Sequence, residues 1–263
     1  MLRSAIAIAV AVAAGAVIAP PAQAAPTRVV ALGDSYIAGI GAGSYTVTDF
    51  CRRSSRSYAA DAARRTASRI TDLSCPGATV PDVRAQASRV PANATVVIIQ
   101  VGGNDIGFSR LAMSCFAGGQ STCLQAVEEA QAALPALAVG LTEIIAEVRT
   151  RAPGSRIALA GYPALVSSVA ACSASWLGFL LDADEISAVI DLQAQLDATI
   201  ATTARAQGAT FIDWPRAVDR HSVCSPDSWI VTPLSGPVED SLHPTAKANA
   251  AMGRQAAAFI RGG

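Results

Sequence analysis

A serine motif near the start of the chain could supply a nucleophile for acyl transfer. Ser35 lies in the stretch Gly-Asp-Ser-Tyr that begins at Gly33, directly after an apolar run, so its hydroxyl and its own N–H can face one crevice. The stretch differs from the G-x-S-x-G elbow because Ile37 takes the place of the second glycine. Gly-Asp-Ser sequences are also common in turns and at helix starts, so this motif alone leaves a purely structural role open.

A second motif could stabilise negative charge on an ester oxygen. Asn104 follows Gly102 and Gly103, which come directly after the most strongly strand-like segment of the chain. Two glycines let the backbone approach a ligand closely, and an asparagine amide can donate a hydrogen bond to an oxyanion. The same residues could instead form a turn that caps the following helix.

A histidine near the end of the chain could act as the general base. His243 precedes Pro244, which favours an extended backbone, and Asp240 lies three residues earlier. A carboxylate there could fold back to Nδ1 and fix the tautomer that leaves Nε2 free to accept a proton. The alternative is a surface histidine that follows a loop. His221 lacks this arrangement and has Asp219 two residues before it, so we favour His243 as the base.

These motifs need a scaffold that brings the ends of strands together. Strand-length and helix-length apolar segments alternate from residue 27 onward, which predicts an α/β domain with a parallel sheet. We expect strands over Arg28–Leu32, Arg69–Leu73, Thr95–Val101, Arg156–Ala160 and Thr210–Ile212, and helices over Ser57–Ser68, Leu124–Arg151, Asp184–Gln207 and Thr245–Ile260. Pro135 predicts a kink or a division of the second helix. Each motif follows or precedes such an element, as ligand-binding residues of open α/β sheets do.

The N-terminal segment has the features of a signal peptide. Arg3 supplies a positive charge, Ala5–Ala19 is an apolar run, and Ala22-Gln23-Ala24 fits a cleavage site for signal peptidase. The alternative, a membrane anchor, is disfavoured because the run is shorter than the ~20 residues of a spanning helix. We therefore expect residues 1–24 to be removed and residues 25–263 to form one catalytic domain in a secreted protein.

Charge and cysteine content narrow the possible partners. Lys+Arg and Asp+Glu are both 20, so nothing indicates nucleic acid binding or stable insertion into a membrane. Six cysteines without a C-x-x-C pair, beside two histidines, predict no metal site. In an exported chain they indicate three disulfides, for which fifteen connectivities exist. Proximity in the sequence favours the pairs Cys51–Cys75, Cys115–Cys123 and Cys172–Cys224.

The apolar stretch Trp176–Leu181 bears on the substrate. It lacks the regular polar spacing of a surface helix, and core packing is its simplest interpretation. If this stretch borders the site, it favours a substrate with an acyl chain over a sugar substrate.

Taken together and in this order, the motifs resemble the GDSL-type, or SGNH, hydrolase superfamily. A fourth stretch, Cys-Pro-Gly-Ala around Gly77, is similar to the segment in which that family places a backbone N–H donor. Ser35, Gly77, Asn104 and His243 fall on the letters S, G, N and H, and Asp240 on the family's acid. The cysteine pattern resembles the branch of secreted actinobacterial lipases and esterases whose three disulfides pair consecutive cysteines.

The resemblance implies a three-layer α/β/α fold with a mainly parallel five-stranded sheet, and ester hydrolysis through an acyl-serine intermediate. The N–H groups of Ser35 and Gly77 and the side chain of Asn104 would form the oxyanion hole. Some relatives orient the histidine with a main-chain carbonyl, but the spacing of Asp240 leads us to expect a full Ser-His-Asp triad. Tyr36 departs from the leucine of the family's name.

The substrate class stays open at this stage. The resemblance implies a small-molecule or lipid ester as substrate, no cofactor and a monomer. The alternatives to a lipase or esterase are a carbohydrate O-acetylesterase, a phospholipase and an inactive binding module.

Overall fold

The computed structural model describes residues 26–46, 50–233 and 235–262, and its centre is a parallel sheet. The strands are β1 (Arg28–Gly33), β2 (Arg69–Asp72), β3 (Val96–Gln100), β4 (Arg156–Ala160) and β5 (Thr210–Ile212). They run in the order β2-β1-β3-β4-β5, and every pairing is parallel. This is the doubly wound order in which the connections reverse direction between β1 and β3.

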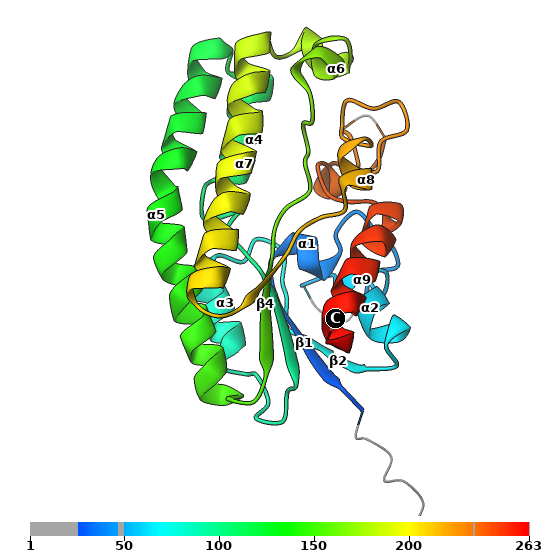
Figure 1. Cartoon of the computed structure of the whole chain (residues 1–263). Coiled ribbons are helices and arrows are strands. Elements are labelled where there is room, and N and C mark those ends of the chain that lie inside the picture. The colour runs from blue at the N-terminus through cyan, green and yellow to red at the C-terminus, as the bar shows by residue number, and fades with distance from the viewer. Residues whose placement is uncertain (1–25, 47–49, 234, 263) are drawn as a thin grey trace, which may run out of the picture.

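Helices cover both faces of the sheet. The longer ones are α2 (Tyr58–Arg65), α3 (Val80–Ala87), α4 (Phe108–Ala117), α5 (Gln120–Arg151), α7 (Ala183–Ala206) and α9 (Ala246–Arg261). The short ones are α1 (Ser35–Ala38), α6 (Val169–Ser173), α8 (Arg216–Asp219) and the 3₁₀ turns η1 (Trp176–Phe179) and η2 (Val238–Asp240). Figure 1 shows α3, α5 and α7 on one side of the sheet and α2 and α9 on the other. The protein therefore has the predicted three-layer α/β/α architecture.

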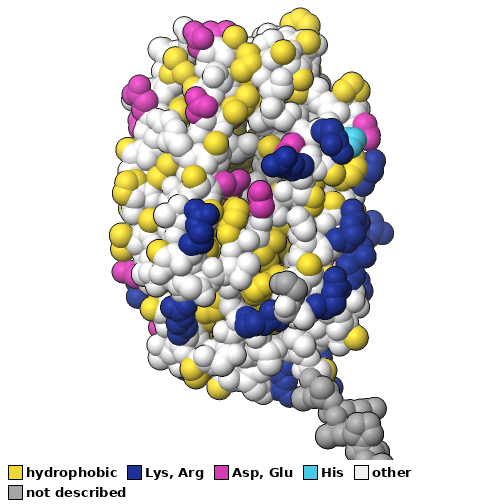
Figure 2. Space-filling model, in the orientation of Figure 1, with side chains coloured by type: hydrophobic (Ala, Val, Ile, Leu, Met, Phe, Trp, Pro, Cys, Tyr) yellow, Lys and Arg dark blue, Asp and Glu magenta, His cyan; other side chains and the backbone are white. Residues whose placement is uncertain are grey.

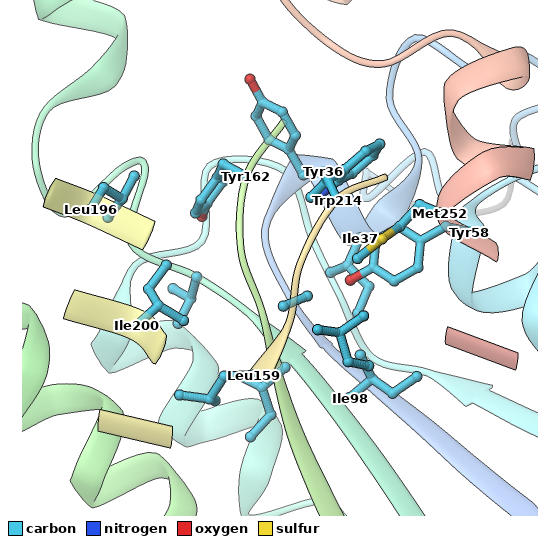
Figure 3. Packing of buried hydrophobic residues seen from close by; sticks show 14 of the residues in the cluster. Tyr36, Ile37, Tyr58, Ile98, Leu159, Tyr162, Leu196, Ile200, Trp214 and Met252 are labelled. Carbon is cyan, nitrogen blue, oxygen red and sulfur yellow. The ribbon is translucent and has the colours of Figure 1, made fainter. Parts of the chain in front are cut away.

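The core follows from this layering. All five residues of β3 are buried, because the central strand of a parallel sheet has a helical layer on each face. The edge strand β2 instead alternates between exposed and half-buried residues. Figure 3 shows core side chains from both helical layers meeting the strands, such as Leu196 of α7 and Met252 of α9.

The predicted strands are all present, within one or two residues of their expected ends. The four predicted helices are also present, but α2 ends three residues before the predicted end and α5 begins four residues before the predicted start. Two further details differ. Helix α5 runs unbroken through Pro135, whose neighbours Leu134 and Leu137 are buried, so burial of its apolar side outweighs the lost backbone hydrogen bond. Helices α3 and α4 were not predicted, since both are short and follow glycine-containing or proline-containing turns.

All three disulfides form as predicted. Cys51 pairs with Cys75, Cys115 with Cys123, and Cys172 with Cys224. The first bond joins the loop between α1 and α2 to the loop after β2, the second joins α4 to α5, and the third joins α6 to the loop after α8. The disulfides therefore fasten segments at the carboxyl end of the sheet.

The proposed signal peptide lies outside the described residues. Among those that are described, α5 has the length and apolar composition of a membrane span, but it packs against α3, α4 and α7 as a core helix does. Figure 2 shows basic side chains gathered along the α2 and α9 side and acidic ones mainly toward α5 and α7. The formal net charge of 0 is thus unevenly distributed over the surface.

Candidate active site

The candidate nucleophile Ser35 and Asn104 follow neighbouring strands of the sheet. Ser35 begins α1 directly after β1, and Asn104 lies in the turn after β3, which pairs with β1. The reversal of connections between these two strands opens a crevice at their carboxyl ends. Ser35 and Asn104 are both half-buried there. The sheet order thus explains how motifs separated by about 70 residues reach one site.

Ser35 and His243 form a hydrogen-bonded pair. The Oγ of Ser35 lies 2.7 Å from Nε2 of His243. On the far side of the ring, Nδ1 lies 2.9 Å from the carbonyl oxygen of Ser241. A carbonyl can only accept, so Nδ1 carries the proton and Nε2 presents its lone pair to the serine hydroxyl. Burial lowers the pKa of His243 below its usual 6.5, which keeps this base neutral at neutral pH.

The expected contact between the Asp240 carboxylate and Nδ1 of His243 is not formed in the structure. The three-residue spacing was compatible with a carboxylate at Nδ1, but the backbone of Ser241 takes that place. The Asp240 side chain instead accepts a hydrogen bond from the Tyr45 hydroxyl at 2.7 Å and pairs with the Arg52 guanidinium at 3.3 Å. Arg52 also stacks over the Tyr45 ring, 4.5 Å from its centroid. The carboxylate is thus held beside the base loop without orienting the imidazole directly.

The turn that carries the base has an unusual backbone. Leu242 has a φ of 62°, a left-handed conformation that is uncommon outside glycine. Two backbone hydrogen bonds with Val231 support the turn. The N–H of Val231 donates to the carbonyl of His243, and the N–H of Leu242 donates to the carbonyl of Val231. Gly41 passes so close that a Cβ there would lie 3.0 Å from the Cβ of His243. Neighbouring backbone therefore confines the base from several sides.

Two of the three predicted oxyanion donors, Gly77 and Asn104, lie on adjoining turns. The Asn104 amide donates to the carbonyl of Ala78 at 3.0 Å, which leaves its second N–H for a ligand. Gly77, next to Ala78, has a φ of 80°, which suits glycine. The Cys51–Cys75 bond anchors this turn to the loop that carries Arg52. The structure thus brings Gly77, Asn104, Ser35 and His243 to one end of the sheet.

Several polar residues around the site were missed by sequence reasoning. Gln86 of α3 accepts from the N–H of Gly33 at 2.7 Å and donates to its carbonyl at 3.0 Å, immediately before the nucleophile turn. Tyr162 follows β4, and its hydroxyl lies 2.5 Å from the Asp34 carboxylate. Its position directly after a buried strand was the same signal that singled out Ser35 and Asn104. For Gln86 no such signal exists, because it lies inside a helix.

An apolar cavity lies next to the candidate site, since Tyr36 and Gly103, the sequence neighbours of Ser35 and Asn104, form part of its lining. It runs between α4 and α7 and is lined almost entirely by hydrocarbon, with Tyr36 and Gly103 at the catalytic end. A second apolar cavity shares Phe108 and Leu111 with the first and reaches Leu242, next to the base. Leu177 and Leu181 line this second cavity. Both belong to the apolar stretch Trp176–Leu181, for which the sequence left open a place in the core or beside the site. Core packing therefore holds for Leu177 and Leu181, which are buried, but not for Phe179, which is 91% exposed.

His221 lies apart from this arrangement. Its ring stacks on Trp229 with centroids 4.1 Å apart, and its Nδ1 lies 2.7 Å from the carbonyl oxygen of Asp227. Among the described residues no group of histidine, cysteine and carboxylate side chains is arranged to hold a metal ion.

Comparison with known proteins places this chain in a family. Residues 31–251 match the GDSL-like Lipase/Acylhydrolase family. A lipase from Streptomyces rimosus is 35% identical over 238 residues, which cover 89% of this chain and 86% of that protein. The crystal structure of the extracellular lipase from Streptomyces rimosus superposes with a TM-score of 0.79 at 32% identity, covering 89% of this chain and 98% of the other. Phospholipase A1 from Streptomyces albidoflavus NA297 follows with a TM-score of 0.78 at 29% identity, covering 89% and 99%.

A serine and a histidine paired at the carboxyl end of a doubly wound sheet are the arrangement expected of a serine hydrolase. This chain belongs to the GDSL-like lipase/acylhydrolase family, and it is a carboxylic ester hydrolase.

Proposed function

We propose that this chain is a secreted lipase or esterase in which Ser35 and His243 act as a catalytic dyad. The observation that carries the proposal is the continuous hydrogen-bonded line from Ser35 Oγ through the imidazole to the Ser241 carbonyl. Ser35 attacks the ester carbon while Nε2 of His243 takes the hydroxyl proton. The same nitrogen then protonates the departing alcohol, and water releases the acid from the acyl-serine in a second round.

The oxyanion is proposed to bind the N–H groups of Ser35 and Gly77 and the free N–H of Asn104. Loss of one such donor typically lowers turnover by about 10²–10³-fold. The Ser241 carbonyl would stabilise the imidazolium through its hydrogen bond, and Asp240 would add its negative charge from a distance. No cofactor is needed for these steps.

The apolar cavities favour esters of acyl chains over acetylated carbohydrates. A sugar site needs polar side chains and exposed aromatic faces, whereas the polar side chains that line the first cavity are Tyr36 and Tyr162, whose hydroxyls already bond to the protein, and the amide of Gln193. That amide is already used, because its oxygen accepts the N–H of Leu165 at 2.8 Å. We therefore infer that the acyl group lies between α4 and α7.

Secretion is supported by the three disulfides, which form in oxidising compartments. We propose that residues 1–24 direct export and are removed, and that residues 25–263 act as a single catalytic domain and as a monomer.

The purified mature protein should be assayed on p-nitrophenyl esters of increasing acyl length and on acetylated xylan. The proposal predicts turnover that rises beyond acetate and little release of acetate from xylan. Preference for acetylated xylan would identify a carbohydrate esterase, and absence of turnover on every ester would identify a binding module.

A further inference from the structure

Two buried tyrosines connect the motifs of the proposed active site. We propose that Tyr36 and Tyr162 are positioning residues that hold the nucleophile, the base and the oxyanion loop in register. Tyr36 follows the nucleophile on α1, and Tyr162 lies just beyond the end of β4. The inference rests on the proposed function, because its measurable effect is on ester turnover.

Tyr36 links the nucleophile helix to the turn that carries the base. Its hydroxyl donates to the carbonyl of Leu242 at 2.8 Å, across 206 residues of sequence. Leu242 lies between His243 and Ser241, whose carbonyl accepts the hydrogen bond from Nδ1 of His243. The ring of Tyr36 also lies against the imidazole, with centroids 5.0 Å apart. Because the left-handed backbone of Leu242 is intrinsically unfavourable, a bond from its carbonyl to a buried hydroxyl helps to fix the turn.

Tyr162 links the nucleophile turn to the oxyanion loop. Its hydroxyl donates to one oxygen of the Asp34 carboxylate at 2.5 Å and accepts the N–H of Gly103 at 3.0 Å. The other oxygen of Asp34 accepts the N–H of Tyr36 at 2.9 Å, as the N-cap of α1. Asn104 follows Gly103, so one hydroxyl sets the distance between the serine turn and the asparagine turn. Burial raises the pKa of Asp34 to about 7, and the hydrogen bond from Tyr162 opposes this rise.

The two rings also contact each other. Their centroids lie 4.9 Å apart in an edge-to-face arrangement, and Figure 3 shows both at the ends of the strands, above Ile98 and Leu159. A leucine at position 36, as in the family's name, could pack there but could not donate to Leu242. The hydroxyl of Tyr36 therefore gives this chain a connection between helix and base turn that the family's named residue does not supply.

A buried tyrosine commonly finds some partner, so the alternative is an ordinary structural role. Tyr58 provides a matched control, because it is fully buried in the same core and its hydroxyl has no hydrogen-bond partner within the described part of the chain. Removing that hydroxyl takes away no bond. A comparison among three Tyr→Phe variants therefore isolates the hydroxyls that reach the catalytic turns.

The test measures kcat and KM on p-nitrophenyl butyrate, with thermal unfolding, for Tyr36→Phe, Tyr162→Phe and Tyr58→Phe. We expect kcat to fall by about 10- to 100-fold in the first two variants, the range caused by small displacements of reacting groups. KM should change little, since the acyl cavity is kept. Tyr58→Phe should match the unmodified protein in kcat.

The pH dependence of kcat/KM in Tyr36→Phe is a second measurement, and it should not change if Tyr36 has a purely structural role. The groups that face the imidazole are Ser35 and Tyr36 on α1 and Asp240 on the base's own turn. Loosening this turn admits water to the imidazole, so the apparent pKa of kcat/KM should rise toward 6.5.

Should Tyr162→Phe fail to fold, the comparison is made in an Asp34→Asn background, which removes the buried carboxylate and keeps an acceptor for the Tyr36 N–H. The inference is overturned if both active-site variants keep the kcat and pH profile of Tyr58→Phe. An unmodified protein without ester turnover would instead refute the proposed function.

Discussion

At the scale of single residues, the hydrogen-bonding capacity of each group decides the proposed chemistry. The Ser241 carbonyl can only accept, so it fixes one tautomer of His243 as a carboxylate would. Burial lowers the pKa of His243 and the negative charge of Asp240 opposes this shift, but the oxygens of Asp240 are occupied by Tyr45 and Arg52. Spacing along the chain could identify Asp240 as a neighbour of the base. It could not reveal that the backbone of the next residue would reach Nδ1 first.

Asp240→Asn should retain most activity. The asparagine oxygen can still accept from the Tyr45 hydroxyl, and the tautomer of His243 is set by the Ser241 carbonyl. We expect a loss of less than about tenfold in kcat, against the roughly 10⁴-fold loss that the same change causes in a serine protease triad. His243→Ala should be inactive and His221→Ala nearly normal in the same assay. A loss of kcat in Asp240→Asn close to that of His243→Ala would instead support a Ser-His-Asp triad.

The pH dependence of turnover should reflect the buried base. Only neutral His243 can accept the serine proton, so activity rises as pH increases through its pKa. Because burial lowers this pKa, kcat/KM should reach half its plateau below pH 6.5. A steady-state pH profile on a soluble ester measures the midpoint, and a midpoint above 6.5 would contradict the assigned environment of the imidazole.

At the scale of elements, the strands were predictable because their apolar runs are buried on both faces. The nucleophile turn and the asparagine turn were also predictable, since both directly follow such strands. The helices α3 and α4 were harder to predict, because they are short, have no long periodic pattern of apolar residues, and depend on tertiary contacts for their stability. Gln86 illustrates the difficulty, since its site-supporting bonds come from α3.

Gln86→Leu should destabilise the protein. It removes both hydrogen bonds to the backbone of Gly33 and leaves a buried N–H without its partner. We expect a decrease in the free energy of unfolding of about 1–3 kcal/mol, the usual cost of a buried unsatisfied group. Urea denaturation measures the change, with Gln125→Leu on the exposed side of α5 as control. Equal stability of the two variants would show that Gln86 is dispensable.

At the scale of the whole molecule, the layered fold and the disulfides were foreseeable, but the joining of distant segments was not. Residues 35 and 243 meet because α9 packs beside α2, which places the turn before α9, where His243 lies, next to α1. The cavity between α4 and α7 likewise depends on an unpredicted helix. The sequence therefore indicated residues that the fold brings to one end of the sheet, whereas the contacts among them could be read only from the fold.

The disulfides should contribute unequally to stability. Cys172–Cys224 spans 52 residues and Cys115–Cys123 spans 8, so the first restricts the unfolded chain more. In the chain-entropy model their removal costs about 4 and about 2.5 kcal/mol. Paired Cys→Ala variants compared by denaturant unfolding measure these values. A larger loss at Cys115–Cys123 would show that native contacts, rather than loop length, dominate.

Covalent labelling of Ser35 tests the central claim most directly. The mature protein is treated with a fluorophosphonate, and peptide mass spectrometry locates the adduct. We predict one modified residue, Ser35, with labelling that stops ester turnover, and no labelling in a folded Ser35→Ala variant. His243→Ala should be labelled far more slowly, because the hydroxyl then lacks its base. Labelling of Ser35→Ala at the same rate as the unmodified protein would contradict the account.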